Sequence, residues 1–256
     1  MSFEDVKHQV AVANRVLSEV GLSSGVLASL GHASMRVPEA PDRFIVKGRG
    51  YAMDALARMT PEQMVVCDLE GYLVEGPPGA TQCFEVKMHS CIYKLYPDVQ
   101  SVVHVHPRFT VVMSVLQANL VPMCQEGINL VSKPLPVYPH VKIIQSEEEG
   151  MEVARLLGPG GKAVLLEGHG AATTGRSLEE SVMNMLQLEE QARMNWYAYC
   201  AAGPNHRSIP QESLEEMGRG PGLTELPHFK NAPPPDQTRR AGGVWAHYTD
   251  IVSRDL

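Results

Sequence analysis

The chain has 256 residues, of which 44% are hydrophobic and 20% are charged, a balance typical of a globular protein with one large or two small domains. Its 22 Lys and Arg residues against 29 Asp and Glu residues give a formal net charge of −7, so we expect no nucleic-acid partner. The five cysteines include no C-x-x-C pair, which argues against a disulfide framework or a zinc ribbon and favours a reducing, cytoplasmic location. We expect neither a signal peptide nor a membrane span, because no stretch approaches about 18 consecutive apolar residues.

Strands and helices alternate along the first 202 residues. Apolar residues at steps of three and four predict an amphipathic helix over residues 6–20 that ends at Gly21. Strands are expected at 44–47, 65–67 and 72–74, with a capped helical start at 60–63 between the first two. A helix over 85–96 and a strand over 99–106 follow, and then helices near 109–116 and over 146–157. A strand over 162–167 and a long helix from Ser177 come last. This interleaved pattern predicts an α/β fold with a single core.

The composition changes near Gly203, where apolar periodicity fades and prolines cluster at 233–235. We therefore predict a catalytic domain over residues 1–202 and an extended C-terminal arm over residues 203–256. The arm holds large apolar side chains that are costly to leave in water, namely Leu226, Phe229, Trp245 and Tyr248. These side chains are expected to pack on the body or on a neighbouring subunit.

Three histidines follow predicted strands in a pattern that suits a metal. Side chains alternate along a strand, so His104 and His106 point to one face and can converge on one ion. H-x-H alone equally fits two ordinary half-buried histidines. His169 changes this balance, because it stands between two glycines directly after an apolar strand, where no packing role is evident. Three histidines leave coordination positions open, as in a catalytic zinc, manganese, iron or cobalt site.

Glu85 is the best candidate for a carboxylate beside these histidines. It begins a predicted helix just before the His104 strand, and His89 lies on the same helix face one turn later. The alternative for Glu85 is an acid favoured at a helix N-terminus by the helix dipole. We interpret Glu85 and His89 as the candidate catalytic pair.

The ordered motifs resemble the class II aldolase/adducin family. The resemblance extends from Gly31 to Arg193 and rests on the segments Gly31-His-Ala-Ser34-x-Arg36, Glu85-Val-Lys-Met-His89, Val102-Val-His104-x-His106, Leu165-Leu-x-Gly168-His169-Gly170 and Gly175-x-Ser177-Leu-Glu-Glu180. It implies a three-layer α/β/α fold with a largely antiparallel central sheet, commonly a homotetramer with sites near subunit interfaces. It also implies that His104, His106 and His169 bind a divalent metal and that Glu85 matches the family's acid/base glutamate.

The chain departs from the sugar-phosphate aldolases of this family at positions that bind phosphate. His32, Lys47 and Cys83-Phe84 stand where those enzymes carry an Asn, a Thr or Ser, and a Ser pair. A phosphorylated sugar is therefore disfavoured. The substituted set suits a planar carboxylated ring, and the predicted substrate contacts are His32, Ser34, Arg36, Lys47 and Phe84. An ordinary salt bridge is the alternative for Arg36.

These features predict a metal-dependent, non-oxidative decarboxylase of a dihydroxyphthalate-like aromatic carboxylate. The metal would act as a Lewis acid without any organic cofactor, and Glu85, or His89 or a water held by it, would protonate the carbon that loses CO2. One alternative is an aldolase or retro-aldolase acting on an unphosphorylated hydroxy-keto acid. Another is an adducin-like interaction module with an inactive site. The spacing indicates no Cys-His pair, so Cys83 is not expected to be a nucleophile.

Overall fold

The computed structural model describes residues 1–222, 225–231, 243–254 and 256. Its centre is one sheet whose strands run in the order β4-β3-β2-β1-β6-β9-β8-β7, with β5 paired to β2. Only the β7–β8 pair is parallel among the described pairs, so the predicted α/β fold with a largely antiparallel sheet is confirmed. The strands are β1 (His32–Val37), β2 (Ala40–Arg49), β3 (Met64–Asp68), β4 (Leu73–Glu75), β5 (Thr81–Gln82), β6 (Ser101–Val105), β7 (Val137–Tyr138), β8 (Ala163–Leu166) and β9 (Gly170–Gly175).

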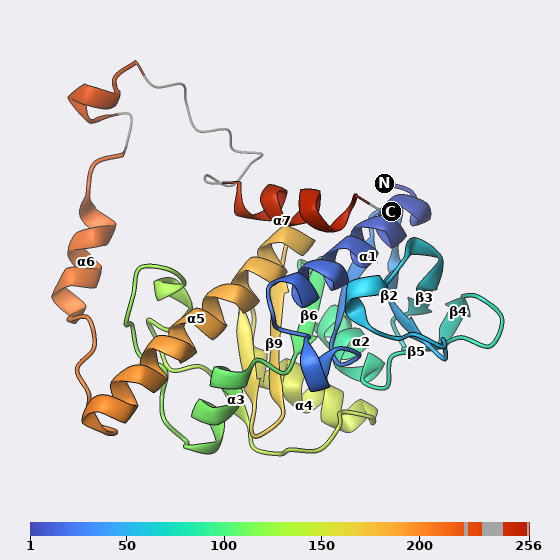
Figure 1. Cartoon of the computed structure of the whole chain (residues 1–256), viewed down its shortest axis with the longest axis horizontal. Coiled ribbons are helices and arrows are strands. Elements are labelled where there is room, and N and C mark those ends of the chain that lie inside the picture. The colour runs from blue at the N-terminus through green and yellow to red at the C-terminus, as the bar shows by residue number, and fades with distance from the viewer. Residues whose placement is uncertain (223–224, 232–242, 255) are drawn as a thin grey trace.

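Helices cover both faces of this sheet (Figure 1). They are α1 (Phe3–Glu19), α2 (Val86–Leu95), α3 (Arg108–Val115), α4 (Glu147–Leu157), α5 (Leu178–Ala202), α6 (Gln211–Arg219) and α7 (Val244–Val252). Short 3-10 turns occupy Gly25–Leu27, Leu56–Arg58, Pro61–Gln63, Ile128–Leu130 and Pro227–Phe229. One hydrophobic cluster joins α1, α3 and α5 to one face of the sheet, and a second joins α2 and α4 to the other face. Successive side chains of a strand point to opposite faces of the sheet, so one strand contributes to both clusters: Val103 faces the first and Val102 the second.

Most predicted elements lie where the hydrophobic period placed them. The N-terminal helix ends at Glu19, and α4 begins with the predicted capping box at Ser146. The strand expected over 99–106 is shorter, because β6 ends at Val105, and the capped start at 60–63 forms a single 3-10 turn. Two central strands, β1 and β9, were not predicted. β1 alternates polar with apolar residues although all six are buried, and β9 consists of Gly, Ala and Thr, which carry little hydrophobic signal.

The C-terminal segment leaves the body and returns to it. Helix α6 projects beyond the end of α5, and none of its residues is buried (Figure 1). Helix α7 packs back on α1, where Trp245 and Tyr248 are partly buried against the first cluster. Phe229 is exposed, and Leu226 is half-buried. The proline cluster at 233–235 lies outside the described residues, and the boundary at residue 203 stays a prediction.

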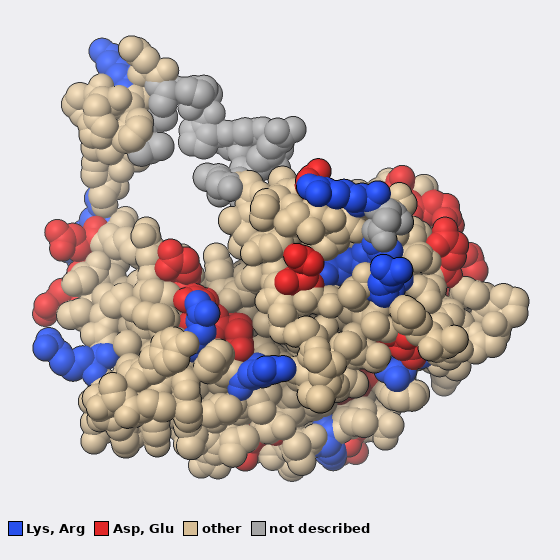
Figure 2. Space-filling model, viewed as in Figure 1, with Lys and Arg blue, Asp and Glu red and all other residues tan. Residues whose placement is uncertain are grey.

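Neither a membrane-spanning helix among the described residues nor a broad basic area on the face drawn in Figure 2 is found. Within the described ranges, none of the helices combines the length and the apolarity that crossing a bilayer requires. On the face shown in Figure 2, Lys and Arg side chains are scattered among Asp and Glu side chains. This face therefore carries no continuous basic surface of the kind that nucleic acids bind.

Gly170 is expected to be intolerant of any side chain. A Cβ atom there would lie 2.4 Å from the Val105 carbonyl oxygen and 3.2 Å from the rings of His104 and His106. Gly170→Ala should therefore lower the free energy of unfolding by about 1–3 kcal/mol, as overpacking does. Chemical denaturation followed by circular dichroism measures this loss. The matched control is Gly218→Ala on α6, where no atom lies within 4 Å of the added Cβ and no loss is expected. Equal stability of the two variants would contradict the prediction.

Candidate metal centre

Three histidines meet at the end of the central strand pair. His104 lies on β6, His106 follows the strand directly, and His169 lies in the turn between β8 and β9. Because β6 pairs with β9, this turn comes to the same end of the sheet as His106. His104 Nε2 lies 3.1 Å from His106 Nε2, and the ring centroids of His106 and His169 are 4.7 Å apart. The structure thus brings together the three predicted ligands.

Glu85 completes the cluster from helix α2, of which it is the N-cap residue. Its Oε2 lies 3.1 Å from His104 Nε2, and its Oε1 lies 3.6 Å from His169 Nε2. The backbone N–H of Ile144 donates a 3.2 Å hydrogen bond to Oε1, a contact that sequence reasoning missed. Burial opposes ionisation, but His104 and His32 outweigh it and hold the pKa of Glu85 well below its usual range. The carboxylate is therefore ionised.

The donor atoms of these four residues suit a cation. The Nδ1 of His104 donates to the carbonyl oxygen of Ala171 at 2.9 Å, so its Nε2, which is directed at the Glu85 carboxylate, is the nitrogen left for a cation. Burial, with His104 close by, lowers the pKa of His106 to about 3 and also lowers that of His169, so both rings are neutral. Facing lone pairs repel unless a positive charge lies among them. Glu85, His104, His106 and His169, whose ligand atoms lie within 4.8 Å of one another, could therefore hold a metal ion.

His32 and His89 lie beside this cluster and are buried. Strand register places His32 opposite His104, and His32 Nε2 lies 3.7 Å from Glu85 Oε2. His89, predicted as a catalytic residue, has no exposed surface and contacts His32 and Ser34. Burial lowers the pKa of His32 to about 4 and that of His89 well below its ordinary value. Both rings are neutral side chains of a buried polar layer.

The other predicted substrate residues separate into two groups. Phe84 is 59% exposed, and the Arg49 guanidinium lies 4.4 Å from the centre of its ring. Lys47 is buried beside this pair and donates to the Ser29 carbonyl at 2.9 Å, while burial lowers its pKa to about 8. Arg36 lies at the far end of β1 instead. Its guanidinium donates to three backbone carbonyls, those of Tyr93, Val99 and Pro41, which indicates a structural role.

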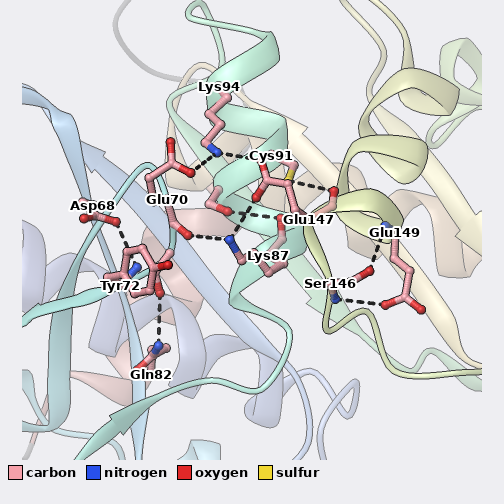
Figure 3. A network of polar contacts seen from close by, with 12 residues as sticks. Asp68, Glu70, Tyr72, Gln82, Lys87, Cys91, Lys94, Ser146, Glu147 and Glu149 are labelled. Carbon is pink, nitrogen blue, oxygen red and sulfur yellow. Dashed lines mark hydrogen bonds and ion pairs between the residues drawn. The ribbon is translucent and has the colours of Figure 1, made fainter.

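Helix α2, which carries Glu85 and His89, is anchored by an ionic network (Figure 3). Lys94 contacts Glu70 at 2.6 Å and Glu147 at 2.7 Å, while Lys87 contacts Glu147 at 2.9 Å. This network ties α2 both to the turn between β3 and β4 and to the first turn of α4. Each pair is partly exposed, so its individual contribution to stability is small. The fixed backbone position of α2 follows from the network together with the apolar α2–α4 contact.

Glu189 supports the site from helix α5. Its two carboxylate oxygens accept hydrogen bonds from the backbone N–H groups of Phe109 and Thr110 and from the Thr110 hydroxyl, all at 2.8–2.9 Å. The two backbone N–H groups belong to the first turn of α3, where they have no partner within the helix. Helix α3 begins two residues after His106. The sequence analysis assigned Glu189 no role, because its partners lie 79 and 80 residues earlier in the chain.

Comparison with known proteins identifies the family of the chain. Residues 8–196 match the sequence profile of the family described as Class II Aldolase and Adducin N-terminal domain. A 3,4-dihydroxyphthalate decarboxylase from Terrabacter sp. (strain DBF63) is 30% identical over 225 residues, which are 84% of this chain and 90% of that protein. Gamma-adducin from Rattus norvegicus is 27% identical over 67% of this chain and 24% of its own length.

The fold also matches a solved aldolase. The L-fuculose 1-phosphate aldolase from Glaciozyma antarctica PI12 superposes with a TM-score of 0.73 over 98% of this chain and 89% of that one, at 20% identity. At this identity, the likeness shows the fold alone. The decarboxylase relative therefore bears more directly on chemistry, since it is more similar in sequence and is covered almost end to end.

Replacement of Glu189 by Gln should destabilise the protein. A single amide oxygen cannot serve both backbone donors, and the amide N–H group would face one of them, so we expect a loss of about 1–3 kcal/mol in the free energy of unfolding. The neighbouring Glu190→Gln is the matched control, because Glu190 pairs only with Arg193 at the surface and should change stability by less than about 0.5 kcal/mol. Urea unfolding of both variants tests this difference. A free energy of unfolding of E189Q equal to that of the parent protein would refute the capping role.

Proposed function

This chain belongs to the class II aldolase and adducin family, and from that premise we propose that it is a metal-dependent, non-oxidative decarboxylase of a hydroxylated aromatic carboxylate of the dihydroxyphthalate type. The family and the decarboxylase relative support a lyase. The observation that carries the proposal is an ionised Glu85 in contact with the imidazoles of His104 and His169, next to a wall that lacks phosphate donors. His104, His106 and His169 are the proposed metal ligands.

The chain's own residues have separate roles in this reaction. A divalent metal, whether zinc, manganese, iron or cobalt, supplies Lewis acidity toward a substrate oxygen. Glu85 is ionised at rest, so it first acts as a base and takes the proton of a substrate hydroxyl. It then returns that proton to the ring carbon from which CO2 departs, and the substrate oxygen regains a proton from solvent. The net change replaces one carboxylate by one hydrogen, without any organic cofactor.

Substrate recognition rests on the residues that replace the phosphate donors. Phe84 offers an exposed aromatic face, and Arg49 already stacks on that ring. Lys47 supplies a buried ammonium beside it, which suits a carboxylate better than it suits a neutral sugar. His32 and Ser34 lie on the buried side of Glu85, since both are buried and paired with other side chains.

We also propose that the protein is cytoplasmic and assembles as a homotetramer with the site near a subunit interface. Val115 and Val141 flank Gly168, next to the ligand His169, and they are 57% and 70% exposed. Apolar side chains left in water beside a catalytic centre are typical of a surface that another subunit covers. The small-molecule substrate would then bind between the metal centre and this covered surface.

Aldol chemistry on an unphosphorylated hydroxy-keto acid is the second candidate. The same three imidazoles could hold a metal ion that would stabilise an enolate as well as a phenolate, so the cluster by itself fits both reactions. The apolar Phe84 and the cationic Lys47 favour the aromatic acid.

A substrate panel separates these two reactions. We expect the purified protein to release CO2 from dihydroxyphthalates and to lose this activity after chelation, with recovery on adding back a divalent metal. The assay monitors CO2 by a coupled enzyme and aldehyde by hydrazone formation on the same samples. Release of aldehyde from hydroxy-keto acids, without CO2 from any hydroxyphthalate, would favour the aldolase instead.

Replacement of Glu85 by Gln should separate metal binding from turnover. The three imidazoles remain, so the metal content measured by mass spectrometry should stay near that of the parent. Turnover should fall at least about 100-fold, because the group that carries the proton is lost. Glu190→Gln is again the control, with both properties unchanged. Activity of E85Q near the parent value would remove Glu85 from the proton-transfer role.

A further inference from the structure

A chain of buried side chains runs from Glu85 into the protein. His32 Nδ1 lies 2.7 Å from His89 Nε2, and His89 Nδ1 lies 2.6 Å from Ser34 Oγ. Ser34 Oγ lies 2.7 Å from the Tyr93 hydroxyl. We propose that this buried chain fixes the Nε2–H of His32 toward the Glu85 carboxylate, whose Oε2 lies 3.7 Å away, and that its other three members are positioning residues.

The Glu85 carboxylate sets the direction of the chain. A carboxylate only accepts hydrogen bonds, so the contact between His32 Nε2 and Oε2 is attractive only when Nε2 carries the proton. A neutral imidazole has a single N–H group, which leaves Nδ1 of His32 as an acceptor for the Nε2–H of His89. In the reverse direction, a lone pair of His32 would face the anion.

Ser34 and Tyr93 complete the same direction. Once His89 donates through Nε2, its Nδ1 is an acceptor and takes the hydroxyl proton of Ser34. Ser34 Oγ can then accept from the Tyr93 hydroxyl, so each member donates toward Glu85. Hydrogen bonds aligned in this way polarise one another, which strengthens the last donor in the series.

The buried chain has no exit to solvent at its far end. Tyr93 is fully enclosed, with its ring against Phe44 and beneath the Arg36 guanidinium, and burial raises the pKa of its hydroxyl far above its ordinary value. A proton therefore cannot be supplied through Tyr93. The chain orients donors and does not conduct protons.

A second metal site is the alternative use of these residues. The ligand atoms of His32, Cys83 and His89 lie within 4.8 Å of one another. However, two nitrogens bound to one zinc ion are about 3.3 Å apart, whereas the His32 and His89 nitrogens are 2.7 Å apart, a hydrogen-bond distance. The hydrogen-bonded chain therefore accounts better for the observed contact.

This inference rests on the proposed function, in which Glu85 carries the proton, because a fixed donor at Oε2 orients the carboxylate for that transfer. Its first test needs no substrate. In protein labelled with nitrogen-15 at histidine, His32 and His89 should both carry the proton on Nε2. Glu85→Gln removes the anion that sets this direction and should mix the two tautomers of both rings. A proton on Nδ1 of His32 in the parent protein, or unchanged tautomers in E85Q, would overturn the proposal.

Kinetics provide the second test. Ser34→Ala should lower kcat about 5- to 10-fold with KM unchanged, and Tyr93→Phe should lower it about 2- to 5-fold, the scale of one neutral hydrogen bond. Ser90→Ala and Tyr138→Phe are the matched controls, since Ser90 is buried on the same helix as His89, and the buried Tyr138 hydroxyl has no hydrogen-bond partner among the residues that the structure describes. Both controls should retain kcat.

Three results separate failure of this inference from failure of the proposed function. If the parent protein releases no CO2 from any hydroxyphthalate, the proposed function fails, while the tautomers still decide whether the buried chain exists. If CO2 is released but S34A and Y93F keep the parent kcat, the positioning role is refuted and the proposed function stands. Two metal ions per protein molecule, one of which is lost in His89→Gln, would show a second metal site and would also refute the positioning role.

Discussion

The site depends on one buried negative charge held among imidazole nitrogens. An ionised carboxylate away from water is costly unless neighbouring donors or cations compensate for it. Glu85 accepts a hydrogen bond from the backbone N–H of Ile144 and has His32 behind it, while His104 and His169 line the candidate metal position on its other side. The same electrostatic requirement explains why a metal ion suits the side of Glu85 that faces His104 and His169. It also explains why a chain of aligned donors suits the side that faces His32.

Rigid supports hold these groups in place from several parts of the fold. Pairing of β1 with β6 places His32 opposite His104, and the close approach at Gly170 brings the His169 turn against β6. Glu189 closes the first turn of α3 beyond His106, and the ionic network of Figure 3 holds α2. The polar centre therefore lies at the end of the buried central strands, where strand pairing and anchored helices hold its side chains.

Substrate choice is separable from this centre. The proposed metal ligands and the proposed proton carrier fit a retro-aldol reaction and a decarboxylation equally well, since both leave negative charge on an oxygen next to the reacting carbon. Arg49 stacks on Phe84, and Lys47 donates to the Ser29 carbonyl, so none of these three residues is a member of the hydrogen-bonded chain. This separation gives a physical reason why one fold can serve different reactions.

The sequence by itself determined the features that repeat locally. Hydrophobic period and capping residues predicted α1, α4 and α5, and the H-x-H and Gly-His-Gly patterns predicted the three histidines. Only the tertiary structure decided which side chains meet across the sheet. It placed Ser34 and Tyr93 behind Glu85, turned Arg36 toward backbone carbonyls, and paired Glu189 with α3. These contacts join segments 57 to 80 residues apart, and strand register and helix packing, which leave no periodic trace in the chain, set them.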